Sequence, residues 1–426
     1  MPTNPTTTNQ QRSGYLFPMI IIGSLFFIFG FVTWLNSVLI PFLQQACQLN
    51  DFQAYLVTTA FYISYFIMAI PASRILNKTG FTKGMSIGLG IMAVGSLIFI
   101  PAAMTRSYPL FLVGLFAQGT GLTLLQTASN PYVTILGPIE SAAKRISIMG
   151  VCNKVAGMIG ILILVEALFS DTKEISAKIA TLSGAELEAE LDLLSRRVIV
   201  PYVIMAVVLT GLAFGILKAH LPEINPEEDD ATPDSAAAKA KTSVFQFPHL
   251  VLGVLCIFVY VGVEVLAIDA LALYGQFQGF DLATSSKFGI YSLIALTIGY
   301  LVGVATIPKT MSQKTALAMS SVMGIVFVIL ALLTDGWVSI GFIVLLSFAH
   351  AFMWPAIWPL SLHSLGRFTK IASALLIMGI VGGALLPLVY GALADSSDRQ
   401  VAFWIMIPCY LYILYFAISG HKAGRA

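Results

Sequence analysis

The chain has 426 residues, of which 58% are hydrophobic and only 10% are charged, and its mean hydropathy is +0.88. Because a soluble domain is about 25% charged, this composition excludes a soluble globular protein. The formal net charge is only +2, and no basic cluster stands out, so nothing indicates a nucleic-acid partner. The sequence therefore predicts an integral membrane protein in contact with lipid.

Long apolar runs separated by short polar turns recur along the whole chain. A run of about 20 apolar residues is enough to cross the hydrocarbon core of a bilayer. In chain order, the runs predict helices over 16–45, 52–76, 83–104, 108–136, 144–169, 198–219, 249–275, 284–307, 313–334, 337–365, 371–395 and 399–419. The predicted fold is an all-α membrane protein with twelve transmembrane helices.

Two polar segments interrupt this pattern. Residues 170–197 carry leucines among charged residues and predict a short amphipathic helix on the outer face, with a solvated connector as the alternative. Residues 220–248 contain prolines, an acidic run and a Ser/Ala/Lys stretch, which is typical of a flexible cytoplasmic linker. The predicted domains are a six-helix bundle over 1–219, the linker 220–248 and a second six-helix bundle over 249–426.

A short internal repeat relates the two predicted bundles. Leu136-Gly137 is followed by Ile148-Met149-Gly150, and Leu365-Gly366 is followed at the same spacing by Ile377-Met378-Gly379. The offset is 229 residues. Parallel repeats of this kind are expected for two pseudo-symmetric bundles related by an axis along the membrane normal.

The loops predict the orientation and give no sign of a metal or cofactor. Lys and Arg are more frequent in the loops on the side of the N-terminus, which places both termini in the cytoplasm of a cell with an inner membrane. The polar first 14 residues do not form a secretory signal. The four cysteines are scattered, so we predict no metal site and no disulfide.

Polar and aromatic side chains inside the apolar runs are the candidate substrate-binding residues. Gln126 and Asn130 lie four residues apart on one helical face, and their amides suit the adjacent hydroxyls of a sugar. Interhelical amide contacts are the alternative. Aromatic faces stack on sugar rings, and the other candidates are Trp34, Asn36, Trp354 and Trp358. For the tryptophans, a position at the membrane interface is the alternative.

Three charged residues lie deep inside apolar runs, where a charge is costly. They are Lys154, Glu264 and Asp269, and we predict that they take part in ion coupling. Lys154 and Glu264 lie at similar depths, so an ion pair between the two halves is possible, and a static buried pair is the alternative. No P-loop is present, which argues against direct use of ATP.

Several strings resemble the major facilitator superfamily, and specifically its fucose-galactose-glucose symporter branch. They are Gln126-Thr127-Ala128-Ser129-Asn130-Pro131, Asn153-Lys154, Tyr260-Val261-Gly262-Val263-Glu264 and Gly379-Ile380-Val381-Gly382-Gly383-Ala384. The resemblance implies a transporter of two six-helix bundles and adds Asn153 to the substrate-binding candidates. The acidic residues that the fucose permease uses for proton coupling are replaced here by Ser37 and Gln126, so that coupling route is not implied.

The expected function is import of a hexose-type sugar, glucose/galactose or N-acetylglucosamine, by cation symport. The coupling ion, Na⁺ or H⁺, is left open, and no other cofactor and no catalytic residue is expected. A non-concentrative sugar facilitator and a fucose-type sugar:proton symporter are the alternatives, and a receptor without transport is a remote one. The chain is expected to act as a monomer, and an enzyme is not expected because no cluster of catalytic residues stands out.

Overall fold

The computed structural model describes residues 5–135, 142–170, 177–179, 181–219, 242–307, 310–363, 365 and 368–424. Within these ranges the side chains of 5–18, 130–135, 142–144, 146–147 and 369–370 are not described. The regular secondary structure of the described part is entirely helical. The all-α prediction is thus confirmed.

The structure describes seven helices of the first half, up to residue 219, over their full length. They are α1 (Pro5–Trp34), α2 (Asn36–Cys47), α3 (Asp51–Met104), α4 (Tyr108–Ile135), α5 (Ala142–Phe169), α7 (Gly184–Arg196) and α8 (Ile199–Lys218). Local signals fix several ends. Gln48 has a positive φ of 53° and ends α2, and Asn50 starts α3 with a reciprocal capping box to Gln53.

The second half, from residue 242, forms the remaining elements. The longer helices are α11 (Pro248–Asp269), α14 (Phe288–Thr306), α15 (Gln313–Leu332), α16 (Gly336–His350), α17 (Met353–Leu362), α18 (Thr369–Met378), α19 (Gly382–Ser396) and α20 (Met406–Ile418). The short ones are η2 (Val244–Gln246), α12 (Leu271–Phe277), α13 (Leu282–Ser285), η4 (Gly379–Val381), η5 (Val401–Ile405) and η6 (Gly420–Lys422). Pro248 occupies the first turn of α11, where a missing N–H has no cost.

The described helices include 11 segments that are long and apolar enough to cross a membrane. One of them, α3, has 54 residues and a non-helical residue, Gly80 (φ 77°, ψ 170°), at a kink inside it. A positive φ of this kind is accessible to glycine and strained for other residues. The residues on each side of Gly80 are numerous enough for one crossing each, so α3 supplies two crossings and the prediction of twelve transmembrane helices is confirmed.

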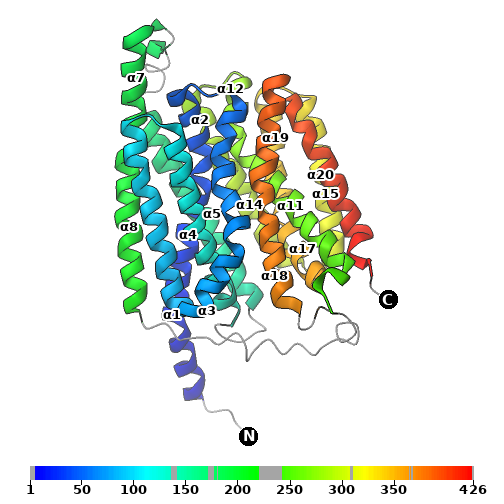
Figure 1. Ribbon diagram of the computed structural model, residues 1–426. Coiled ribbons are helices and arrows are strands. Elements are labelled where there is room, and N and C mark those ends of the chain that lie inside the picture. The colour runs from blue at the N-terminus through cyan, green and yellow to red at the C-terminus, as the bar shows by residue number, and fades with distance from the viewer. Residues whose placement is uncertain are drawn as a thin grey trace.

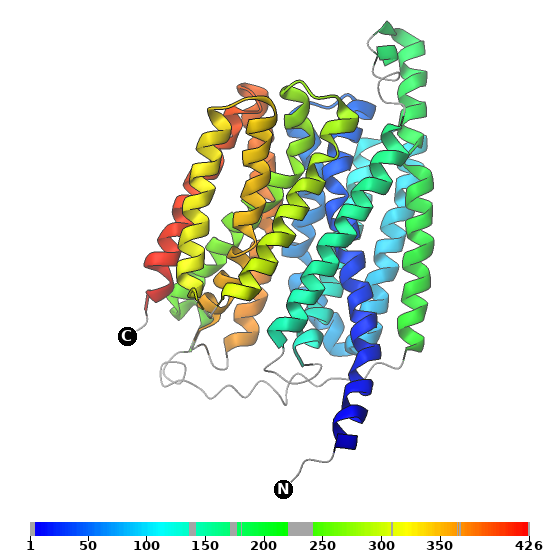
Figure 2. The ribbon, with the colours of Figure 1, turned by 180° about the vertical axis from the view of Figure 1, so that it is seen from behind.

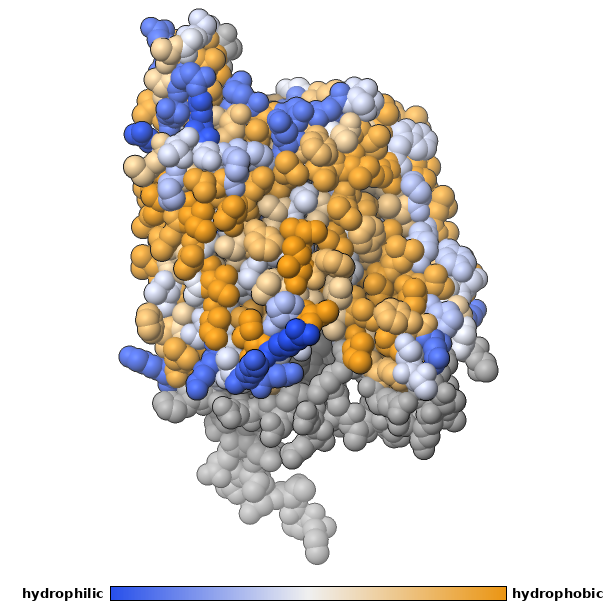
Figure 3. Space-filling view, in the orientation of Figure 1, coloured by the Kyte–Doolittle hydropathy of each residue, from blue (hydrophilic) through white to orange (hydrophobic). Residues whose placement is uncertain are grey.

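The helices of the two halves gather on opposite sides of the molecule, as the two ribbon views show (Figures 1 and 2). The end from which α7 projects is called the α7 face here, and the end at which α1 begins is called the terminal face. Hydrophobic residues form a broad band between these faces, and hydrophilic residues gather toward both ends (Figure 3). This distribution is what a bilayer requires of a protein that spans it.

Two close backbone contacts are repeated between the halves. A Cβ atom on Gly30 of α1 would lie 1.8 Å from the carbonyl oxygen of Asn153 in α5, and one on Gly382 of α19 would lie 1.7 Å from that of Phe258 in α11. Gly382 follows Asn153 by 229 residues, and Phe258 follows Gly30 by 228. The contacts therefore share the offset of the sequence repeat to within one residue.

The predicted amphipathic helix corresponds to α7, whose Leu191 and Leu194 are buried. Residues 171–176 and 180 of that prediction lie outside the described residues. The same holds for 220–241 of the predicted linker and for Leu136, Gly137 and Gly366 of the repeat.

Candidate functional site

The helical hydrogen-bonding pattern is locally irregular at several points of the membrane-crossing helices in the described part of the chain, while the backbone at these points stays right-handed helical. These points include Leu35 between α1 and α2, Ala270 between α11 and α12, Ala351 and Phe352 between α16 and α17, and η4 between α18 and α19. Trp34, Asn36, Asp269 and Trp354 each lie within two residues of such a point.

In the first half, the structure brings together Trp34, Asn153 and Lys154. The indole Nε1 of Trp34 donates to Oδ1 of Asn153 over 3.3 Å, and Nζ of Lys154 lies 4.4 Å from the centroid of the indole. Lys154 is buried and Asn153 is half-buried. A cation over an indole face is attractive, so the tryptophan is held in a fixed orientation from two sides.

The other predicted amides lie in different surroundings. Nε2 of Gln126 donates to the hydroxyl of Tyr65 over 3.0 Å, and the ring of Tyr65 stacks on that of Tyr62. Asn36 is 1% exposed, and its Nδ2 has no hydrogen-bond partner among the described residues. A buried donor without a partner is costly, which fits a group that binds a ligand. The side chain of Asn130 lies outside the described residues.

In the second half, aromatic side chains gather beside the buried carboxyl group of Glu264. The hydroxyl of Tyr260 donates to Oε2 of Glu264 over 2.8 Å, and the ring of Tyr260 lies 6.2 Å from that of Trp354. Trp354 stacks on Trp358 with centroids 5.4 Å apart. His350 is buried and shares a 2.7 Å hydrogen bond with the hydroxyl of Tyr410, which fits a packing role better than a free titrating group.

The ion pair between Lys154 and Glu264 that the sequence allows is not found among the described residues. Among the ion pairs of the described residues, none joins these two side chains, although the ammonium acts on the carboxyl group through space. Each charged group instead contacts an aromatic residue of its own half. The ammonium of Lys154 lies over the indole of Trp34, and the carboxylate of Glu264 accepts a hydrogen bond from the phenol of Tyr260. Lys154 also lies 6.0 Å from the ring of Tyr300, which belongs to the second half.

Asp269 joins the two halves. It is 2% exposed, and its Oδ2 accepts a hydrogen bond of 3.0 Å from Oγ1 of Thr58 in α3. Next to Thr58, Thr59 donates to the carbonyl oxygen of Ala384 in α19 over 2.8 Å. Asp269 belongs to α11 and Ala384 to α19, and both helices lie in the second half of the chain. The interface between the two halves therefore contains hydrogen bonds as well as apolar contacts.

A charged network on the α7 face also joins the halves, and the sequence did not indicate it. Nε and Nη2 of Arg399 donate to the two carboxylate oxygens of Asp51 over 2.7 and 2.8 Å. Asp395 accepts from the backbone N–H groups of Asp51 and Phe52. Gln44 donates to Asp51 over 2.6 Å. We call the pair Asp51–Arg399 the latch, because it ties the first residue of α3 to the segment after α19.

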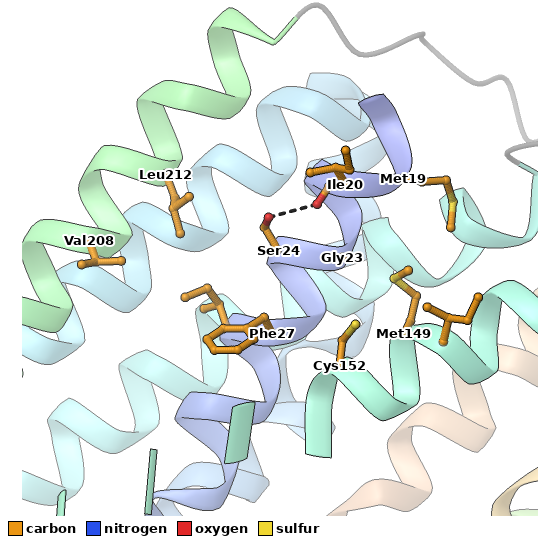
Figure 4. A pocket seen from close by; sticks show the side chains of 11 residues that line it. Met19, Ile20, Gly23, Ser24, Phe27, Met149, Cys152, Val208 and Leu212 are labelled. Atoms are coloured by element: carbon orange, nitrogen blue, oxygen red, sulfur yellow. Dashed lines mark hydrogen bonds between the residues drawn. The ribbon is translucent and has the colours of Figure 1, made fainter. Parts of the chain in front are cut away.

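An apolar cavity of about 640 Å³ lies elsewhere, within the first half. Figure 4 shows it between α1, α5 and α8, with Ser24 bonded to the carbonyl oxygen of Ile20. Its lining includes Phe27, Met149 and Leu212 and none of the candidate binding residues. A recess of this composition on the membrane-facing side is not suited to a sugar.

Comparisons with known proteins place the chain in a family. The model of the Major Facilitator Superfamily matches residues 22–378. The chain is 34% identical over 435 residues to a glucose/galactose transporter of Brucella abortus, covering 99% of both proteins. It is 28% identical to the L-fucose-proton symporter of Escherichia coli, covering 96% of this chain and 94% of that protein.

Solved structures agree with this assignment. The crystal structure of the transporter FucP in the outward conformation superposes with a TM-score of 0.71 at 29% identity, covering 95% of this chain and 98% of that one. An inward-facing structure of a bacterial homologue of the lysosomal transporter Spinster gives a TM-score of 0.67 at 14% identity, over 98% of this chain and 96% of that one, and shows the fold alone. The chain therefore belongs to the major facilitator superfamily and, within it, to the fucose-galactose-glucose symporter family.

Proposed function

We propose that this protein imports a hexose-type sugar, glucose/galactose or N-acetylglucosamine, by cation symport. One observation carries the proposal: helices of both halves bring amides and indoles into the interior of the membrane-spanning region, together with the buried carboxyl group of Glu264. Amide groups can form hydrogen bonds with the hydroxyl groups of a sugar, and indoles can pack on the apolar face of the sugar ring. Gln126, Asn153, Trp34 and Trp354 are the described residues to which we assign this role. The names of the relatives, glucose/galactose transporter and L-fucose-proton symporter, support a sugar substrate.

Transport would follow from rocking of the bundles 1–219 and 249–426 around this region, with 220–248 as the linker. In the structure the α7 face is closed by the latch between Asp51 and Arg399. We place the terminal face, with both termini, in the cytoplasm, in an inner membrane, and we expect a monomer. The state described here is then closed toward the outside.

Glu264 is the residue to which we assign ion coupling, with Lys154 and Asp269 in supporting roles. Glu264 is 9% exposed and is the acid next to the aromatic cluster, through its bond to Tyr260. A carboxyl group there can carry H⁺ or ligate Na⁺. If no ion is coupled, the protein is a facilitator, which is the alternative function.

Uptake of labelled sugars into proteoliposomes, with Na⁺ and H⁺ gradients imposed separately, tests the proposal. We expect accumulation against a sugar gradient with one of the two ions. Glu264→Gln should abolish this accumulation and leave sugar exchange, because the amide keeps the shape and removes the charge.

The matched control is Glu166→Gln, the same change on the exposed side of α5, which should behave as wild type. Equilibration without accumulation in the wild type would identify a facilitator. Accumulation at the wild-type level in Glu264→Gln would remove the coupling role from this residue, and the absence of any sugar flux would refute the proposal.

A further inference from the structure

A second cavity, of about 390 Å³, lies between the two halves on the α7 face. One wall is α2, and the other is the end of α12 and the turn that follows it, which lie side by side in Figure 1. Its lining residues are Pro41, Gln44, Gln45, Gln276, Phe280 and Leu282. None of the residues assigned to the transport site lines it. Its volume is within the range of small-molecule sites, which is roughly 300 to 1,000 Å³.

Gln276 is the side chain in this cavity that can form new hydrogen bonds with a ligand. It is half-buried, and its amide makes no hydrogen bond within the described part of the chain. The amide of Gln278, two residues later, is hydrogen-bonded within the protein. Its Nε2 donates to the hydroxyl of Tyr274 over 2.9 Å, and its Oε1 accepts from the N–H of Gly336 over 2.7 Å. The protein thus uses the amide of Gln278 for its own structure, whereas Gln276 lines the cavity with its amide available for a ligand.

The other wall groups add a fixed aromatic ring and no charge. Phe280 packs edge-on against Phe288, with centroids 5.3 Å apart, and against Trp337, with centroids 4.6 Å apart. Gln44 keeps its Oε1 as an acceptor, because only its Nε2 is bonded to Asp51. Amides for hydroxyl groups and one rigid ring for an apolar face suit a neutral polyhydroxylated ring, whereas an anion or a cation would find no counter-charge in the lining.

Resting on the proposed function, we infer that this cavity is a second, accessory binding site for the same class of monosaccharide, at the outer mouth of the transport path. Gln276 and Gln44 bind its hydroxyls, and Phe280 covers one face of its ring. The walls belong to different halves, so the site is complete only while the α7 face is closed. A sugar bound there stabilises that closed state and slows transport when the sugar concentration at this face is high.

Equilibrium binding of labelled D-glucose and D-galactose to the full-length protein, up to high millimolar concentration, tests this inference. We expect two molecules of one of these sugars per wild-type chain, with different affinities. Gln276→Leu should weaken the weaker binding by about tenfold or more, as the loss of an amide that bonds two groups implies, and leave the stronger binding unchanged. Initial uptake rates should fall at high external sugar in the wild type and not in Gln276→Leu.

Two further variants separate the possible outcomes. Gln126→Ala should weaken the stronger binding only, and Gln313→Leu, the same change as Gln276→Leu at the start of α15 on the terminal face, should change neither. One molecule per wild-type chain, with no effect of Gln276→Leu, would overturn the inference and leave the proposed function intact, since the cavity then holds water. No binding of either sugar at any concentration, together with no sugar uptake, would refute the proposed function and this inference with it.

Discussion

Breaking the latch should open the α7 face. In Arg399→Gln, the two charge-assisted hydrogen bonds to Asp51 that join the halves are lost. Hydrogen bonds to charged groups contribute about 1.5 to 3 kcal/mol each. The Arg399 side chain is 21% exposed, and water screens the pair, so we take about 2 kcal/mol for the whole change. At 1.36 kcal/mol per tenfold, the ratio of closed to open molecules should fall by about 30-fold.

Spin labels on the two halves can measure this shift. Leu193 and Leu333 are 60% and 76% exposed, so cysteines can be placed there after the four native cysteines are replaced. Arg399→Gln should add a population at longer label-to-label distance. Lys287→Gln removes an exposed cation that forms no ion pair within the described residues and should leave the distances as they are. An unchanged distribution in Arg399→Gln, or an equal change in Lys287→Gln, would refute the latch.

Three further predictions concern packing and recognition. Gln126→Ala should weaken sugar binding by about 1 to 3 kcal/mol, because a ligand hydroxyl loses its hydrogen-bond partner, whereas Gln118→Ala, in the same helix, should leave the affinity unchanged. Titration calorimetry measures both affinities, and equal affinities of the two variants would mean that Gln126 has a structural role only. Thr58→Val should lower the melting temperature because the buried carboxyl group of α11 loses its hydrogen bond, and Thr58→Ser should retain the wild-type value; a stable valine variant would count against this contact. Gly382→Ala should destabilise the fold by about 1 to 3 kcal/mol through overpacking, and Gly341→Ala, with open space around it, should not; equal melting curves would contradict the close approach.

Much of the fold could be predicted from the sequence. The twelve crossings follow from the length of the apolar runs, and the prediction separates 52–76 from 83–104, where the structure has the kink at Gly80. The length of an apolar run is a strong signal for a transmembrane helix, because every helix that crosses a bilayer must span the thickness of its hydrocarbon core. The local helix irregularities at Leu35 and Ala270 gave no such signal, since neither residue has a proline or glycine next to it.

The candidate site could be predicted in part. Trp34, Asn153 and Lys154 meet as a group, because residues with costly polar atoms in a membrane must find partners. The partner of each charge could not be predicted, since depth along a helix does not fix the direction of a side chain. The similar depths of Lys154 and Glu264 allow an ion pair, whereas in the structure Lys154 lies over the indole of Trp34. Asp51 and Arg399 lie at helix ends, where charged residues are common, so the sequence does not mark them as a pair.

One feature, α7, has a practical consequence for following motion. It runs into α8 almost without interruption, and Arg106 in the turn before α4 forms ion pairs with its Glu188 and Asp192. Ser195 also bonds the carbonyl oxygen of Ala103. These ties fix α7 to the first half, and it projects beyond the other helices (Figure 1). An antibody fragment raised against α7 would therefore add mass to an otherwise small particle and report the tilt of one bundle directly in electron micrographs.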